Sequence, residues 1–243
     1  MTKDPLFRVK VLSKTLDPAT LVWQAMHQDY SEAFVFDEEP PNEKDAGDLI
    51  IKHLLKGGRG HFGPMEHPSI TFACGHFPHS VMQQARTHRV GVSFDVQSMR
   101  YTGQRIARHE HTGDWADTER LFYLRPCGFY TDRQGNKYEY TTIHRGQDLV
   151  AIEHAIARYK DALEKGFAEE HARGLLPFDF RQHFVVTFNL RSLMHFLDLR
   201  AKLDAQWEIQ QMCELMMPHF EEWIPSIYHW YKETRWAKAR LAP

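Results

Sequence analysis

The pattern of hydrophobic and polar residues predicts three strands in this chain. Residues 7–11 alternate with a period of two, which is typical of a strand with one buried face. Residues 69–73 and 184–188 are short runs rich in β-branched and aromatic residues, which favours strands at both places. Residues 120–143 also have strand-like composition, with a hairpin signal at 133–137.

Apolar residues that recur every three or four positions predict several helices. The first begins at Pro18, and the second is capped by Asn42, with Lys56 in its last turn and Gly57 and Gly58 ending it. Further helices are expected over 78–90, 149–163, 169–173 and 204–220. Strands and helices together predict an α/β fold of the α+β type, a mixed and largely antiparallel sheet flanked by helices. No repeat or linker interrupts the chain, so we expect a single domain over residues 1–243.

Composition narrows the classes of function. The chain has 243 residues and a net charge of −2, so it lacks the generally basic character of a sequence-independent nucleic-acid binder. Three cysteines, Cys74, Cys127 and Cys213, stand far apart, which indicates neither a disulfide framework nor a cysteine zinc site. No run approaches the roughly 20 apolar residues of a membrane span. We therefore expect a cytoplasmic enzyme with no membrane or nucleic-acid partner.

Residues 83–105 concentrate positive charge and candidate chemistry. The stretch holds Arg86, Arg89, Arg100 and Arg105, with His88, Ser98 and Tyr101 between them. Guanidinium groups repel one another, and their planar fork suits phosphate oxygens. The cluster predicts an anion-binding site, although a solvated basic patch is the alternative.

Histidine is abundant, and a metal site has to be weighed. The chain has 16 histidines, and His109-Glu110-His111 is the densest spot. These two histidines share a face only on a strand, and no HExxH sequence is present. We expect no metal at these spacings.

Three segments carry a resemblance to a known family. Arg86-Thr87-His88-Arg89, eight residues and then Ser98-Met99-Arg100-Tyr101 resemble the signature of flavin-dependent thymidylate synthases, from which Thr87 and a longer spacer depart. Residues 60–67, a Gly-His-x-x-Pro-x-Glu-His loop, match the family at each fixed position. The segments 189–200 and 205–210 are also similar to it. The chain is accordingly identified as a member of this family.

The resemblance implies ligands and the residues that hold them. It implies conversion of dUMP to dTMP, with methylenetetrahydrofolate as carbon donor and FAD, reduced by NADPH, as hydride source. The absence of a GxGxxG sequence requires side chains to bind the FAD pyrophosphate. The implied FAD contacts are Gly63, Arg86, His88, Arg89, Gln97, Asn189, Leu190, Arg191 and His195. The implied dUMP contacts are Gln83, Arg86, Gln97, Ser98, Met99, Arg100, Arg173 and Arg200.

Within these sets we assign catalysis to Arg200 and substrate positioning to Ser98. For Glu66 and His67, which are in neither set, bracing of the loop is the structural alternative. Gln97 is chosen over Val96 because its amide can form hydrogen bonds. The family also implies a homotetramer with shared active sites. Two alternatives stay open, a non-catalytic nucleotide- or RNA-binding protein that uses the same arginines and a His-rich metal hydrolase.

Overall fold

A four-stranded antiparallel sheet with the order β1-β2-β6-β3 organises the fold. Its strands are β1 (Arg8–Lys14), β2 (Ser69–Pro78), β6 (Arg181–Asn189) and β3 (Val92–Val96). Along β2 and β6, buried and partly exposed residues alternate, so each strand presents one apolar face to helices. The expected α/β fold with a largely antiparallel sheet flanked by helices is confirmed.

The structure is a computed structural model that describes residues 3–56, 61–132 and 134–238. The chain divides into two units, each assembled from separate stretches of sequence. The first unit comprises residues 1–7, 75–84 and 95–184, and the second comprises residues 8–74, 85–94 and 185–243. Strands β2, β3 and β6 contribute residues to both units. The expectation of a single domain stays a prediction.

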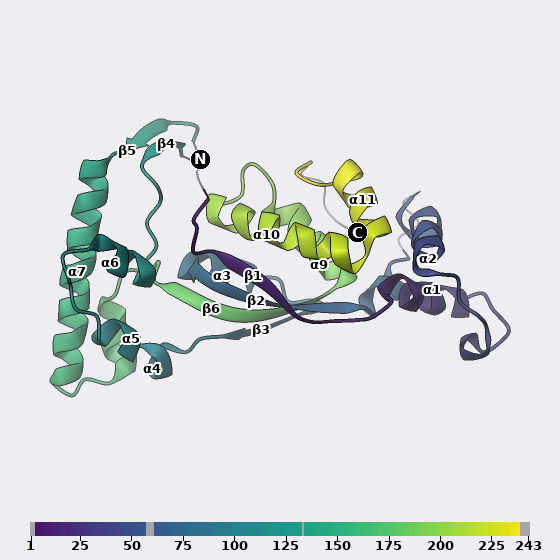
Figure 1. Ribbon diagram of the computed structural model, residues 1–243, viewed down its shortest axis with the longest axis horizontal. Helices are drawn as coiled ribbons and strands as arrows, with labels where there is room; N and C mark the ends of the chain where they lie inside the picture. The colour runs from purple at the N-terminus through teal and green to yellow at the C-terminus, as the bar shows by residue number, and fades with distance from the viewer. Residues whose placement is uncertain (1–2, 57–60, 133, 239–243) are drawn as a thin grey trace. The chain divides into compact units, whose positions relative to one another are not determined.

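In the second unit, the helices that follow β6 lie over one face of the strands, and the two helices between β1 and β2 pack against each other at one end of the strands (Figure 1). The helices are α1 (Pro18–Gln28), α2 (Glu43–Ile50), α9 (Leu190–Arg200), α10 (Trp207–Trp223) and α11 (Pro225–Thr234). Helix α2 continues as a π-helical turn over Ile51–Leu55, and short 3₁₀ turns lie at Val35–Asp37 and Gly63–Glu66. Phe72, Val186 and Phe188 are fully buried beneath these helices, so the apolar faces of β2 and β6 form the centre of this core.

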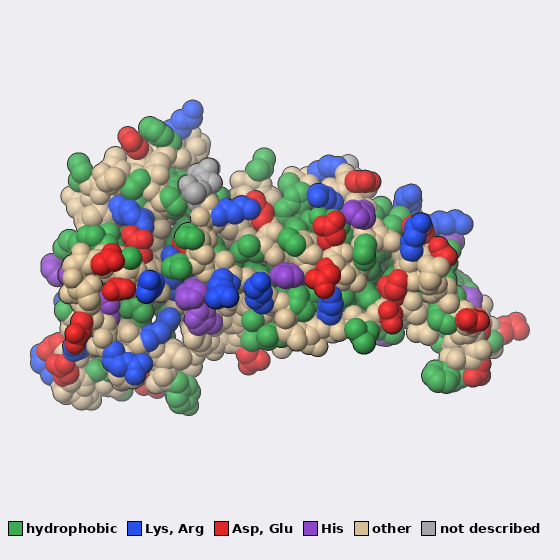
Figure 2. Space-filling model, viewed as in Figure 1, with side chains coloured by type: hydrophobic (Ala, Val, Ile, Leu, Met, Phe, Trp, Pro, Cys, Tyr) green, Lys and Arg blue, Asp and Glu red, His purple; other side chains and the backbone are tan. Residues whose placement is uncertain are grey.

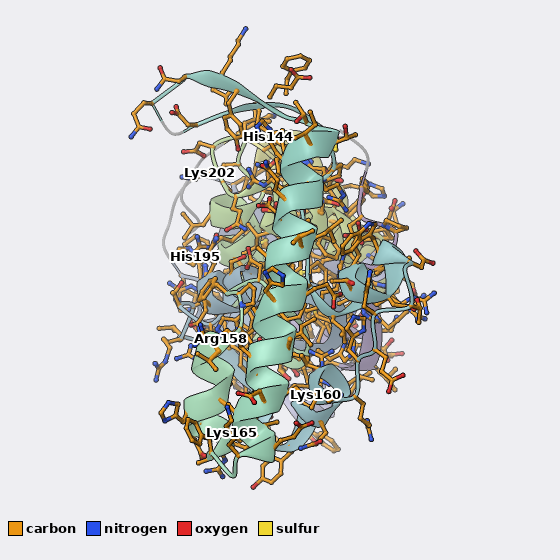
Figure 3. The ribbon with its side chains drawn as sticks, turned by 90° about the vertical axis from the view of Figure 1, so that its left-hand side faces the viewer. His144, Arg158, Lys160, Lys165, His195 and Lys202 are labelled. Atoms are coloured by element: carbon orange, nitrogen blue, oxygen red, sulfur yellow. The ribbon has the colours of Figure 1, made fainter. Side chains whose placement is uncertain are left out.

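The first unit is built around the long helix α7 (Thr142–Glu164). The unit also contains α3 (His79–Ala85), α4 (Met99–Thr102), α5 (Gln104–Ala107), α6 (Trp115–Leu121), the hairpin β4 (Gly128–Thr131) and β5 (Lys137–Tyr140), α8 (Glu169–Ala172) and a 3₁₀ turn at Arg173–Leu175. Figure 3 shows α7 lengthwise, with His144 near its start and Lys165 near its end. Ile152, Ile156 and Tyr159 on its inner face join Met99, Ile106 and Phe122 in one apolar cluster. The spacing of three and four along α7 therefore serves packing, as expected.

Several expected elements are confirmed by their bounds. Helix α1 begins at Pro18, and the side chain of Asn42 caps α2 by accepting a hydrogen bond from the Asp45 N–H at 3.0 Å. The strand expected at 184–188 is the centre of β6. Gly57, Gly58 and Arg133 lie outside the described residues.

Other expectations were wrong in extent. The helix expected over 78–90 covers only His79–Ala85, and the chain then turns, with Gly91 at a φ of +65°. The segment expected to be strand-like from residue 120 starts inside a helix, because α6 extends to Leu121. The helix expected from Asp204 begins at Trp207. The sequence analysis did not anticipate β3 or α11.

No helix among residues 3–56, 61–132 and 134–238 combines the length and apolar character needed to cross a membrane. On the face shown in Figure 2, acidic and basic side chains are interspersed, in agreement with the net charge of −2.

Candidate functional site

The loop Thr87–Gly91 is fastened to the first turn of α9. Asn189 donates its N–H to the Gly91 carbonyl at 3.0 Å, and the Ser192 hydroxyl donates to the Val90 carbonyl at 2.7 Å. A Cβ atom on Gly91 would lie 2.3 Å from Asn189 Nδ2, so the close approach requires glycine here. The signature segment is thereby held against the N-terminal end of a helix.

That helix end is itself capped. The Asn189 side-chain oxygen accepts a hydrogen bond from the Ser192 N–H at 2.8 Å, which is the usual role of an N-cap asparagine. Leu190 is fully buried, and its N–H donates to the Pro68 carbonyl. The predicted contacts of Asn189 and Leu190 with FAD therefore stay predictions, while both residues have a structural role in the fold.

A pocket of about 340 Å³ opens between the loop and α9. The residues that line it come from the loop, the start of β3 and one face of the helix: Thr87, His88, Arg89, Val90, Val92, Ser192, His195, Leu199 and Arg200. The pocket unites four of the predicted site residues, namely His88, Arg89, His195 and Arg200. Arg86 is exposed and does not line it.

His88 is a neutral hydrogen-bond partner of Arg200. The Arg200 Nε–H donates to His88 Nε2 at 3.0 Å. A guanidinium has no acceptor, so Nε2 offers its lone pair and the ring proton lies on Nδ1. Burial, together with the charges of Arg200 and His195, lowers the pKa of His88 from 6.5 to about 4. His88 is therefore the neutral member of its pair with Arg200.

Arg200 ends α9 and reaches two residues of the loop. Besides His88, its Nη2 donates to the Thr87 hydroxyl at 3.0 Å. Burial lowers the pKa of Arg200, but a guanidinium keeps its charge across the range in which proteins are stable. Thr87, the residue that departs from the family signature, thus positions the arginine that we assigned to catalysis.

Arg191 lies one turn before His195 on α9 and is held by the Gly/Pro-rich loop. Its Nη1 pairs with Glu66 Oε1 at 2.6 Å, and its guanidinium lies 5.8 Å from the centre of the Phe62 ring. This ion pair links the loop to α9. Gly63 opens the 3₁₀ turn of the loop, and a Cβ added there would meet no atom within 4 Å, so close packing does not explain glycine at this position.

The first unit holds most of the residues predicted for dUMP. Ser98 precedes α4, Met99 and Arg100 begin it, and Arg173 follows α8, which contacts α4. Arg100 Nη1 pairs with Glu170 Oε1 at 3.2 Å across these helices. Hydrogen bonds with Tyr101 and Glu170 raise the pKa of Arg100. Arg100 and Arg173 are both exposed.

The remaining predicted residues of this unit are tied to their neighbours. Gln97 Oε1 accepts a hydrogen bond from the His183 N–H at 3.0 Å, which links the end of β3 to β6. Gln83 Nε2 lies 2.6 Å from His79 Nε2. Met99 is buried in the apolar cluster around α7, which leaves its backbone for any contact with a ligand.

Sequence reasoning missed two residues that shape the pocket. Ser192 lines it and closes the hydrogen bond to Val90. Thr87 was noted only as an insertion, although it accepts a hydrogen bond from Arg200. No local pattern marks either residue, because their partners lie more than 100 positions away in the sequence.

Comparisons with known proteins cover nearly the whole chain. The family described as "Thymidylate synthase complementing protein" matches residues 10–226. The flavin-dependent thymidylate synthase of Haloarcula marismortui is 34% identical, over 97% of this chain and 99% of that protein. The flavin-dependent thymidylate synthase of Halobacterium salinarum is also 34% identical, over 97% of this chain and all of that protein.

Solved structures share the fold. A UMP/dUMP methylase from Streptomyces cacaoi bound with 5-Br dUMP matches with a TM-score of 0.71 and 25% identity, over 98% of this chain and 97% of that one. Thymidylate synthase X from Helicobacter pylori, solved with FAD and dUMP, matches with a TM-score of 0.66 and 18% identity, over 87% of this chain and 92% of that one.

Proposed function

The chain belongs to the flavin-dependent thymidylate synthase family, and from this premise we propose that it methylates dUMP to dTMP with FAD as its flavin. We further propose methylenetetrahydrofolate as the carbon donor and NADPH as the reductant. The observation that carries the proposal is the linkage of Arg200, His88 and Thr87 at the wall of a pocket built by the family's signature segment.

The residues of the second unit fit a flavin dinucleotide. Arg89 and Arg191 supply guanidinium groups suited to a pyrophosphate. Arg191 lies at the capped N-terminal end of α9, and Arg89 lies on the loop that is fastened to this end. His88 and His195 add aromatic rings, 5.6 Å apart between centres. Reduced FAD, when bound, supplies the hydride that completes the new methyl group. Gly63, Arg86, Asn189, Leu190 and Gln97 are the further contacts we propose.

The exposed arginines of the first unit fit the phosphate of a nucleotide. Arg100 is paired with Glu170 at the surface, and an ion pair of this kind is weak enough for an incoming phosphate to replace. Arg173 stands on the adjacent 3₁₀ turn. We propose that Arg100 and Arg173 bind the phosphate of dUMP while Ser98, Met99, Gln83 and Gln97 position the nucleoside. Arg86 and Arg200 are proposed as further dUMP contacts.

Arg200 is proposed to activate the uracil ring. While N3 carries its proton, C5 of uracil is a poor carbon nucleophile. Once solvent has taken the N3 proton, a guanidinium beside N3 would stabilise the N3 anion. The anion raises electron density at C5, which then attacks the methylene donor. Arg200 is suited to this role, because its charge does not titrate and its hydrogen bonds to His88 and Thr87 fix the plane of its fork.

A homotetramer with shared active sites is the proposed assembly. Apolar side chains stand exposed beside the candidate residues of each unit: Val90 is 82% exposed next to the pocket, and Tyr101 is 77% exposed next to Arg100. A second copy of the chain would cover such residues and complete the site. Light scattering should give a mass near four times 28.6 kDa at micromolar concentration, and a monomer mass would contradict the assembly.

The sugar of the nucleotide, ribose in UMP or deoxyribose in dUMP, is the main question of specificity. The methylase from Streptomyces cacaoi is described as acting on UMP and dUMP, which makes UMP the competing substrate. The two relatives at 34% identity favour dUMP. Parallel assays with the two nucleotides at equal concentration separate these cases.

The purified protein should have the visible absorbance of bound FAD and should form dTMP from dUMP, methylenetetrahydrofolate and NADPH. A colourless protein that takes up no added FAD would contradict the proposal. If the protein retains FAD but methylates UMP and not dUMP, the proposed flavin chemistry holds and the proposed substrate is wrong.

A further inference from the structure

We propose that His109, His111 and Glu153 form a binding site for a zinc ion in the first unit. The sequence analysis weighed the two histidines and rejected a metal, because their spacing suits neither a helix nor an HExxH motif. The fold adds a third potential ligand from α7, 42 residues after His111. This site is separate from every residue proposed above for FAD or dUMP.

The three side chains converge on one point. His109 Nε2 lies 2.9 Å from Glu153 Oε1, and His111 Nδ1 lies 3.6 Å from the same oxygen. One ligand atom from each of the three residues lies within 4.8 Å of the other two. Tetrahedral zinc with bonds of about 2.0–2.1 Å separates its ligand atoms by about 3.3–3.4 Å, so the observed distances bracket that geometry.

Burial and exposure also fit a metal site. The side chains of His109 and Glu153 are 6% and 17% exposed, which shields two of the ligands from water. The side chain of His111 is 39% exposed, which leaves the fourth position open to water or another ligand. Two nitrogens and one carboxylate oxygen form a donor set that suits zinc and disfavours magnesium, which prefers six oxygens.

Neighbouring groups hold the ligands in place. The Thr118 hydroxyl donates a hydrogen bond to Glu153 Oε1, and the His111 ring lies 4.7 Å from the Trp115 ring. Partners of this kind orient metal ligands in known sites.

The metal would cross-link two parts of the unit that are separated in the sequence. His109 and His111 lie on the segment between α5 and α6, and Glu153 lies on α7. A zinc ion would fasten this segment to the helix that carries the apolar core of the unit. Binding of this ion does not depend on FAD or dUMP.

The test uses tag-free protein stripped with a chelator and titrated with Zn²⁺ alone. Wild-type protein should bind one Zn²⁺ per chain in competition with a chromophoric chelator, and its midpoint of thermal unfolding should rise. His111→Gln should weaken binding at least about tenfold, because one of three protein ligands is lost. Co²⁺ should give the visible spectrum of a four-coordinate site in wild-type protein and lose it in His111→Gln.

Matched controls lie beside the ligands. His154→Gln removes an exposed imidazole next to Glu153, and Glu110→Gln removes an exposed carboxylate between the two histidines. Both variants should bind Zn²⁺ as the wild type does. His111→Gln is the main variant because its side chain is the most exposed of the three, so the fold should tolerate the change. Absence of stoichiometric Zn²⁺ binding by the wild type, or equal binding by His111→Gln, would overturn the proposal.

Discussion

In the second unit, the candidate residues hold one another. Arg200 donates to His88 and Thr87, and the loop that carries them is fastened to α9 through Gly91, Asn189 and Ser192. In the first unit, Arg100 is held across two short helices by Glu170, and both side chains are half exposed. One set of residues is built into the fold, whereas the other lies at the surface with an acidic partner.

This difference indicates two modes of ligand binding. The pocket beside α9 is preorganised, so a ligand there gains from groups that need no rearrangement. A phosphate that approaches Arg100 has to displace Glu170, which costs little because exposed ion pairs contribute little to stability. We therefore expect substitutions in the second unit to affect chemistry and stability, and substitutions in the first unit to affect substrate affinity.

The largest expected effect is that of Arg200→Lys. Lysine keeps the charge at the end of α9 but loses the planar fork that contacts His88 and Thr87. Loss of a transition-state contact of this kind costs about 3–4 kcal/mol, on the order of a few hundredfold or more in turnover. Single-turnover assays should show that the variant binds FAD and accepts hydride from NADPH but forms almost no dTMP. Near-normal turnover with saturating dUMP would show that Arg200 acts only as a favourable charge at the end of α9.

Arg100→Ala tests the surface arginines. Removal of a charged hydrogen bond to a phosphate should raise the dissociation constant of dUMP about tenfold or more and leave FAD binding unchanged. Isothermal titration with dUMP measures the change. Arg120→Ala, at an exposed arginine of the same unit paired with Asp117, is the matched control and should bind dUMP normally. Equal effects of the two substitutions would mean that general electrostatics, not a site, attracts the nucleotide.

His88 makes stability depend on pH. Its pKa is about 4 in the folded chain and 6.5 in the unfolded chain, so between these values only the unfolded chain binds the proton. The free energy of unfolding of the apo-protein should therefore fall as pH decreases from 6.5 toward 4, by up to about tenfold in the folding constant per pH unit. Burial also lowers the pKa of His183, which adds to the same trend.

Urea denaturation of the wild type and of His88→Asn at pH 5 and pH 7 isolates the share of His88. The variant should lose less stability than the wild type on acidification. Identical losses in both proteins would show that His88 ionises normally in the fold and that other groups cause the pH dependence.

Thr87→Val should have the smallest effect. The variant keeps the shape of the side chain but removes one hydrogen bond to Arg200, which is worth about 0.5–1.5 kcal/mol. Turnover should fall a few-fold, to about tenfold at most, while Thr87→Ser should retain the wild-type rate. If Thr87→Val and Thr87→Ser behave alike, the hydroxyl does not position Arg200.

Much of the fold could be predicted from local patterns. The cap at Asn42, the helix start at Pro18, the helix ending at Arg200 and the strand around 184–188 depend on residues within a few positions of one another. The same holds for the signature segments. Their residues lie close together in the sequence, and they carry the resemblance to the family. Errors in extent arose at element ends, as where α3 ends at Ala85 although the expected helix ran to residue 90.

By itself, therefore, the sequence determined the fold class, the family and the residue types available for chemistry, since periodicity and motifs act over a few residues. Only the tertiary structure decided that Arg200 meets His88, 112 residues away, and that Glu153 joins His109 and His111. Burial and neighbouring charge then decided that His88 is neutral. These outcomes depend on the pairing of distant strands and on desolvation, neither of which is encoded in any short stretch of the chain.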